Sequence, residues 1–63
     1  MPLLITLQRG IYYCERRQLL AGRIGIGNSI QSAIYDYLQQ CNENFTVSEI
    51  DLKVNGVINR IKI

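Results

Sequence analysis

The chain of 63 residues contains no histidine and no tryptophan, only one proline and one phenylalanine, and two cysteines. Without histidine it lacks the commonest general base and the commonest metal ligand of proteins. Its five carboxylates are scattered along the chain, and no serine or cysteine has a histidine to activate it. These absences predict a protein that is not an enzyme and that requires no metal or other cofactor.

The scarcity of cysteine and of long apolar runs bears on where the chain acts. Cys14 and Cys41 are 27 positions apart and form no CxxC motif, and a small secreted domain usually has more disulfides. We expect both to be buried, free thiols in a reducing compartment. No apolar run approaches the roughly 18 residues of a membrane span, and the first residues lack the basic start of a signal peptide. The sequence therefore predicts a cytoplasmic protein with no membrane contact.

The composition that is present is typical of a small folded domain. Hydrophobic residues make up 48% of the chain and charged residues 19%, which argues against disorder. At this length we expect a single domain, residues 1–63, with a core that supplies about 3–5 kcal/mol. The net charge of +2 is too small to indicate nucleic-acid binding by itself, although residues 1–31 are the more basic half.

The clearest local pattern lies near the C-terminus, where Asn55-Gly56 is the preferred pair for a two-residue type I′ hairpin turn. The register that follows pairs Ser48 with Ile63, Glu49 with Lys62, Ile50 with Ile61, Asp51 with Arg60, Leu52 with Asn59, Lys53 with Ile58 and Val54 with Val57. Residues 46–61 also resemble a helix-turn-helix superficially, but their apolar residues alternate with the period of a strand. Because Gly56 needs positive φ, we expect Gly56→Val to cost more stability than Gly25→Ala.

An amphipathic helix is predicted over residues 28–41. Its apolar side chains recur at helical spacing: Ile30, Ala33, Ile34, Tyr37, Leu38 and Cys41. Asn28 or Ser29 suits its start, and Asn42 or Asn44 its end.

Upstream of the helix, alternating residues on either side of Arg9-Gly10 predict a second hairpin within residues 3–15. A third strand is expected within residues 17–26. The predicted fold is therefore α+β, with the order β-β-β-α-β-β and one amphipathic helix packed on a mainly antiparallel sheet.

Two sets of residues are candidates for binding. The first set combines an aromatic residue with three cationic ones: Tyr12, Arg16, Arg17 and Arg23. Such groups stack on bases and hold phosphates, but they are equally enriched at protein interfaces. The second leads into the start of the helix, where free N–H groups attract anions: Gly25, Gly27, Asn28 and Ser29. A tight strand-to-helix connection explains these glycines equally well, and neither GxGxxG nor a P-loop is present.

Residues 3–41 carry a family resemblance. The residues that carry it are Leu4-Ile5-Thr6-Leu7, Ile11-Tyr12-Tyr13-Cys14, Gly25, Gly27, Ser29, Ala33, Ile34, Tyr37 and Leu38. This pattern resembles the N-terminal domain of HicB-like antitoxins, although Ser32 replaces that family's acidic residue and a hairpin follows instead of its DNA-binding tail. The resemblance implies a degenerate RNase H-like β-β-β-α-β fold without catalytic carboxylates, which binds and masks a small toxin ribonuclease.

Three functions are consistent with these residues. The first is a small non-catalytic binding module that acts through a protein interface, antitoxin-like by the resemblance. The alternatives are a nucleic-acid-binding module that uses the basic Arg/Tyr strand surface, and a structural or assembly subunit. We also expect a homodimer or higher oligomer, because short hairpins leave unpaired strand edges and because Ile11, Tyr13 and Ile58 lie on the hairpin faces opposite the main apolar rows.

Overall fold

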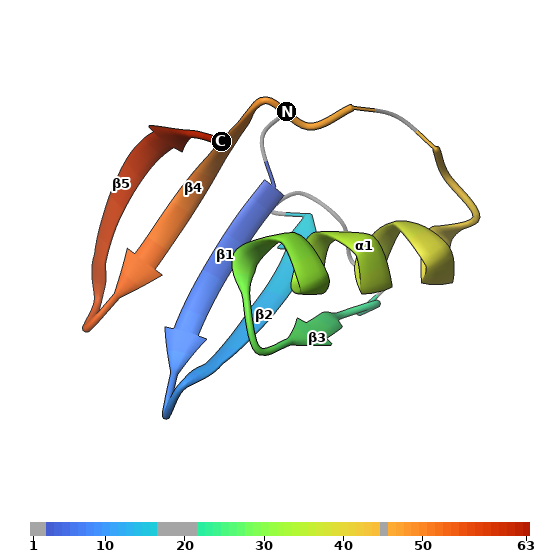
Figure 1. The fold of residues 1–63 in the computed structure, drawn as a ribbon. Helices are drawn as coiled ribbons and strands as arrows, with labels where there is room; N and C mark the ends of the chain where they lie inside the picture. The colour runs from blue at the N-terminus through green and yellow to red at the C-terminus, as the bar shows by residue number, and fades with distance from the viewer. Residues whose placement is uncertain (1–2, 17–21, 45) are drawn as a thin grey trace.

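The computed structural model describes residues 3–16, 22–44 and 46–63, and shows a five-stranded sheet with one helix (Figure 1). The elements in chain order are β1 (Leu3–Gln8), β2 (Ile11–Arg16), β3 (Gly25–Gly27), α1 (Ile30–Cys41), β4 (Glu49–Val54) and β5 (Val57–Lys62). The predicted α+β class and the order β-β-β-α-β-β are therefore confirmed. Of the third strand expected within residues 17–26, the described part is β3, and residues 17–21 lie outside the described residues.

The sheet has the strand order β3-β2-β1-β4-β5. Neighbouring strands are antiparallel except for β1 and β4, which run parallel in the middle of the sheet. The chain passes from β3 at one edge through α1 and then enters β4 on the far side of β1. The parallel pair thus joins two antiparallel halves, β3-β2-β1 and the hairpin β4-β5.

Both hairpins turn on two residues with positive φ, as a type I′ turn requires. Asn55 and Gly56 have φ of 53° and 82°, and Arg9 and Gly10 have φ of 54° and 78°. The register of β4 with β5 is the predicted one at every pair. The conformation of the turn residues is thus consistent with the alignment of each hairpin.

Side-chain and backbone caps define α1 at both ends. The helix begins at Ile30, slightly later than predicted, because Ser29 is the N-cap and its Oγ accepts a hydrogen bond from the Ser32 N–H at 3.1 Å. At the other end Asn42 adopts the left-handed conformation with φ of 54°, and its N–H donates to the Gln39 carbonyl at 3.2 Å. Of the two candidates at each end, the structure selects Ser29 and Asn42.

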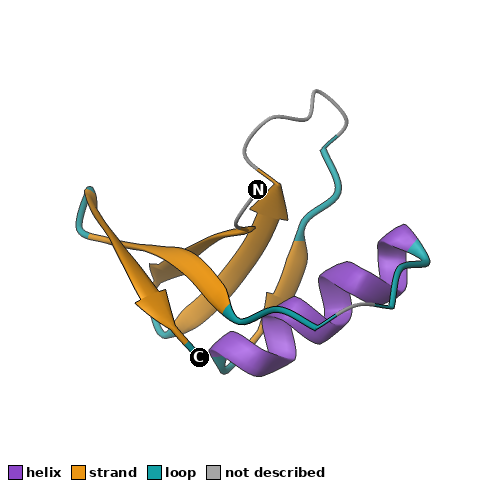
Figure 2. Ribbon diagram, turned by 90° about the horizontal axis from the view of Figure 1, so that it is seen from above, coloured by secondary structure: helices purple, strands orange, loops and turns teal. Residues whose placement is uncertain are grey.

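The core lies between α1 and one face of the sheet (Figure 2). Its buried members are Leu3, Ile5, Cys14, Ala33, Ile34, Tyr37 and Ile50. The main contacts of α1 are with β3 and β2, whereas β4 and β5 extend beyond it on the other side of β1 (Figure 1). Because strand side chains alternate between faces, the helix-side face of β4 and β5 continues this apolar surface with little helix above it.

Gly25 and Gly27 let β3 approach α1 at backbone distance. A Cβ added to Gly25 would lie 2.6 Å from the Tyr37 Cβ and closer still to the Ala33 carbonyl oxygen, and one added to Gly27 would lie 2.6 Å from the Ala33 nitrogen. A Cβ added to Gly56, by contrast, would meet no described atom within 4 Å. The expectation that Gly56→Val costs more than Gly25→Ala is therefore reversed, because the glycine in β3 is required by close packing and not by its φ.

Candidate interaction surface

The described members of the predicted set of aromatic and cationic residues are separated in the structure: Tyr12 and Arg16 lie near opposite ends of β2, and Arg23 lies just before β3. Arg16 Nη2 donates to Glu43 Oε1 and Oε2 at 2.8 and 2.7 Å, and its guanidinium carbon lies 5.7 Å from the centroid of the Tyr37 ring. The hydrogen bond to Glu43 raises the pKa of Arg16. Arg23 Nη1 donates to the Gln40 carbonyl at 2.6 Å. Both arginines therefore hold the C-terminal end of α1 against the rest of the fold.

Tyr12 lies four residues before Arg16 on the same strand, which is about 13 Å along β2. It lines a surface depression with residues from the start of α1 and the end of the chain: Asn28, Ser29, Ile30, Gln31 and Ile63. The structure thus brings Tyr12 together with two residues of the other predicted set and separates it from Arg16 and Arg23. Arg17 lies outside the described residues.

The predicted anion site is accounted for largely by structural roles. Gly25 and Gly27 contact the backbone of α1 closely, as described above. Ser29 Oγ caps the helix and also donates to Ser32 Oγ at 2.9 Å. Asn28 is exposed beside Tyr12. No further contact in the described residues points to an anion, so anion binding at this position stays a prediction.

The two thiols are free, and they differ in burial. Cys14 is fully buried, as predicted, whereas Cys41 is only half-buried. Burial raises the pKa of the Cys14 thiol to about 12. It also raises the pKa of Tyr37 to about 12, with a further contribution from a hydrogen bond with Cys41. At neutral pH Cys14 and Tyr37 therefore stay protonated, and Cys14 lacks the thiolate character that a nucleophile needs.

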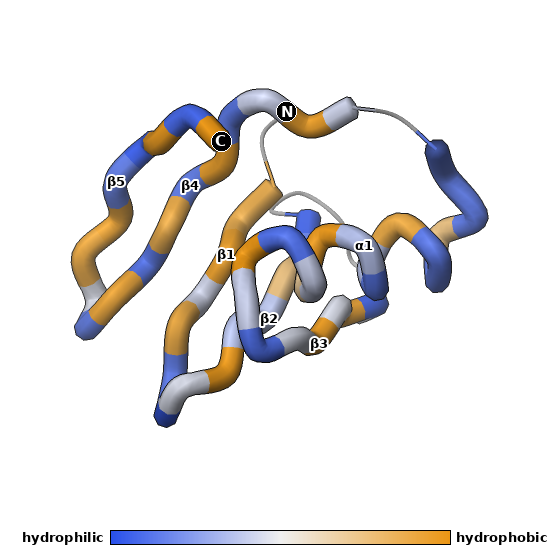
Figure 3. Tube along the Cα trace, viewed as in Figure 1, coloured by the Kyte–Doolittle hydropathy of each residue, from blue (hydrophilic) through white to orange (hydrophobic). Residues whose placement is uncertain are grey.

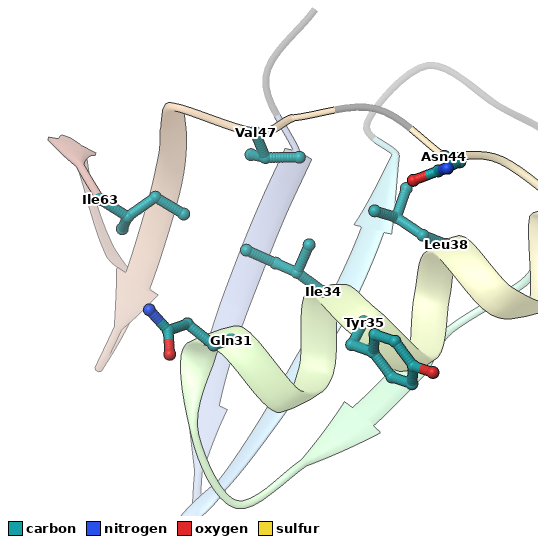
Figure 4. Close-up of a pocket in the computed structure, with 7 residues that line it drawn as sticks. All are labelled: Gln31, Ile34, Tyr35, Leu38, Asn44, Val47 and Ile63. Atoms are coloured by element: carbon teal, nitrogen blue, oxygen red, sulfur yellow. The ribbon is translucent and has the colours of Figure 1, made fainter.

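A groove lies between α1 and the C-terminal end of the chain (Figure 4). We call it the helix–hairpin groove, and its lining is Gln31, Ile34, Tyr35, Leu38, Asn44, Val47 and Ile63. Ile34 and Leu38 come from α1, and Val47 and Ile63 come from the segments before β4 and after β5. None of the lining side chains is charged. Tyr35 is 67% exposed and Ile63 47%, so two large side chains of this groove are open to solvent.

Strand β5, which leads to Ile63, is an edge strand of the sheet and contains both apolar and polar residues (Figure 3). The side chain of Val57 lies on the face that bears α1, and that of Ile58 lies on the opposite face. Val57 is 58% exposed and Ile58 42%. On the face opposite α1, Arg60 Nε donates to Oδ1 of the buried Asp51 at 3.0 Å, and this bond raises the pKa of Arg60. Together with the groove, β5 holds four of the six large hydrophobic side chains that are exposed in the described residues.

No family model, curated protein or solved structure matches this chain. In the part of the chain that the structure describes, no helix is long and apolar enough to cross a membrane. The same residues contain no group of three or more His, Cys, Asp and Glu side chains that would hold a metal ion. The function is therefore inferred from the surfaces that the fold leaves uncovered.

Sequence reasoning did not identify the helix–hairpin groove. The periodic pattern marked Ile34 and Leu38 as apolar residues of the helix, but it gave no information on which neighbour would cover them. The alternation of the predicted hairpin placed Ile63 on its apolar face, but nothing in the sequence placed Ile63 or Val47 beside the helix. Their proximity to α1 follows from the parallel pairing of β1 with β4, which places both ends of the C-terminal hairpin segment beside the helix.

Proposed function

We propose that this chain is a small non-catalytic binding module that acts through a protein interface, and that the interface is formed by the helix–hairpin groove and strand β5. The observation that supports this most strongly is the character of the groove. Its lining is apolar or neutral, and it exposes Tyr35 and Ile63. Aromatic side chains such as Tyr35 are enriched at protein interfaces, and the buried centre of an interface is more apolar than the rest of the surface.

The nucleic-acid alternative receives less support from the same geometry. Affinity for nucleic acid depends on cations that are available to phosphates. Arg16 is engaged by Glu43 and Arg23 by the Gln40 carbonyl. A module of this kind would need those contacts to be exchanged for phosphates, whereas a protein partner can use the groove as it stands.

The resemblance to HicB-like antitoxins adds one class of partner, a small toxin ribonuclease. This assignment stays a prediction. A toxin would occupy the groove as a compact protein, and it would require no catalytic group from this chain.

Affinity capture from nuclease-treated extract of the source cells tests the proposal. The bait is the wild-type chain, and Ile63→Asp is the variant, because it places a charge in the groove at an exposed side chain. Gln39→Asp is the matched control, since Gln39 is exposed on α1 and does not line the groove. We expect one discrete set of proteins to bind the wild type and the control but not the variant.

Two results would contradict the proposal. Capture that occurs from untreated extract but not from nuclease-treated extract, or that falls steeply with salt, would indicate phosphate contacts instead. Capture that is equal for Ile63→Asp and the wild type would show that the groove is not the binding surface. Circular dichroism of each bait verifies that the variants are folded.

A further inference from the structure

The two edges of the sheet are treated differently by the fold. At β3, side chains of α1 bond the backbone groups that would otherwise be available to another strand. Ile26 N–H donates to Asp36 Oδ2 at 2.9 Å, and Gln40 Nε2 donates to the Ile24 carbonyl at 2.8 Å. Capping an edge in this way prevents pairing with a further strand.

Among the described residues, none covers the backbone of β5 in this way. In an antiparallel hairpin with a two-residue turn, the pair next to the turn exchanges hydrogen bonds, and every second pair after it does the same. Val57 and every second residue after it therefore bond β4, as the Ile63 N–H to Ser48 carbonyl bond of 2.9 Å confirms. The N–H and C=O groups of Ile58, Arg60 and Lys62 point away from β4, and no described residue bonds them.

We propose that β5 pairs antiparallel with β5 of a second copy of this chain, about a twofold axis at Asn59, to form one continuous sheet of ten strands. Each copy contributes its five-stranded sheet. The inference names one partner of the interface proposed above, and it rests on that proposal's premise that the uncovered end of the sheet is where this chain binds protein.

Symmetry and charge select the register. Opposed side chains of an antiparallel pair lie on the same face of the sheet. A twofold axis between two copies of β5 must therefore lie where a residue of one copy is opposite the same residue of the other. An axis at Ile58 or Ile61 pairs only three residues of each six-residue strand, whereas an axis at Asn59 or Arg60 pairs five. The axis at Arg60 places two arginines opposite each other, which is destabilising. Asn59 therefore remains as the centre.

In this register the unsatisfied groups of the two strands match. Ile58 of one copy and Arg60 of the other form a hydrogen-bonded pair, and the twofold axis repeats it. Val57 of one copy lies opposite Ile61 of the other, which pairs two apolar side chains on the face that bears α1. No two charges of like sign are directly opposed. The edge is thus complementary to itself in length, hydrogen bonding and apolar contact.

Sedimentation velocity at roughly 1–100 μM, a range suited to small interfaces, tests the register through charge exchange at the axis. The side chain of Asn59 is exposed, so Asn59→Lys and Asn59→Asp should both fold. Each variant alone places like charges opposite each other, and we expect its dimer dissociation constant to rise about tenfold or more. An equimolar mixture should recover dimer, because lysine then faces aspartate.

A second pair of variants tests the backbone contact itself. Ile58→Pro removes an N–H that points away from β4, a position where an edge strand tolerates proline. Ile58→Ala removes the side chain but keeps that N–H. We expect the alanine variant to remain dimeric and the proline variant, verified as folded by circular dichroism, to be monomeric.

The outcomes separate this inference from the proposed function. A wild-type chain that is monomeric throughout, or a dimer that neither Asn59 variant weakens, overturns the self-pairing of β5. Capture of other proteins that depends on Ile63 would still stand in that case. Charge rescue at Asn59 without any Ile63-dependent capture supports the dimer and overturns the groove as a site for other proteins.

Discussion

Gly25→Ala is the substitution for which the structure makes the sharpest prediction. The added Cβ would lie 2.6 Å from the Tyr37 Cβ, and an ordinary contact requires at least 3.4 Å. Strand β3 and α1 must therefore separate by about 0.8 Å, a gap that forfeits roughly a quarter to a half of each dispersion contact across the interface. The neighbouring atoms include helix backbone, which cannot move aside as a side chain would.

We expect this change to cost about 3 kcal/mol, the upper end for an overpacked core. Gly56→Val should cost about 1–2 kcal/mol, since it introduces positive-φ strain but meets nothing within 4 Å. A chain of this size has only about 3–5 kcal/mol of stability to lose. Gly25→Ala should therefore be at the margin of folding, while Gly56→Val remains folded.

Urea unfolding followed by far-ultraviolet circular dichroism measures the difference. With an m-value of about 1 kcal/mol/M for a small protein, the midpoint of Gly25→Ala should lie at least about 1 M below that of Gly56→Val. Gly22→Ala is the matched control, because a Cβ added to Gly22 would meet no described atom within 4 Å and because Gly22 has no positive φ. A midpoint for Gly25→Ala equal to that of Gly22→Ala would refute the close approach of β3 to α1.

Three further predictions concern stability. Ser29→Ala should lower the free energy of unfolding by about 1 kcal/mol through loss of the N-cap. Arg16→Ala should lower it by up to about 1 kcal/mol, and Arg16→Lys should recover only part, because lysine cannot stack a planar group on Tyr37. The pKa values of Cys14 and Tyr37 are both raised to about 12. The folded state thus keeps protons that the unfolded chain releases, and the stability contributed by these two groups should be fully present at neutral pH and fall between about pH 9 and 12.

Equilibrium unfolding checks each of these, with thermal or urea midpoints measured at several pH values for the last. An unchanged midpoint for Ser29→Ala would show that Ser29 does not cap the helix in solution. Equal midpoints for Arg16→Lys and the wild type would show that stacking of Arg16 on Tyr37 does not contribute to the free energy of unfolding. Stability that rises between pH 9 and 11 would contradict the burial of Cys14, and Cys14→Ala should make the alkaline decline shallower.

The sequence by itself determined the features that depend on neighbours in the chain. Asn55-Gly56 accepts positive φ at both positions, so the turn and the register of β4 with β5 followed from two residues. The spacing of apolar residues determined α1, and the short polar side chains on either side of it limited each cap to two candidates. In each case the energy difference between the observed conformation and its alternatives arises from residues that are close together in the chain.

Only the tertiary structure decided how these elements meet. The parallel pairing of β1 with β4 joins residues separated by more than forty positions, and no local pattern encodes it. That pairing places most of the hairpin on the far side of β1 from the main contacts of α1, and it leaves Val57 and Ile63 exposed where periodicity marked an apolar face. The close packing of β3 on α1 is likewise a tertiary feature, and it makes a side chain at Gly25 costly although the local conformation of Gly25 would accept one. Backbone approach, edge exposure and the partners of Arg16 all depend on three-dimensional proximity, and a single sequence specifies that proximity only through the fold as a whole.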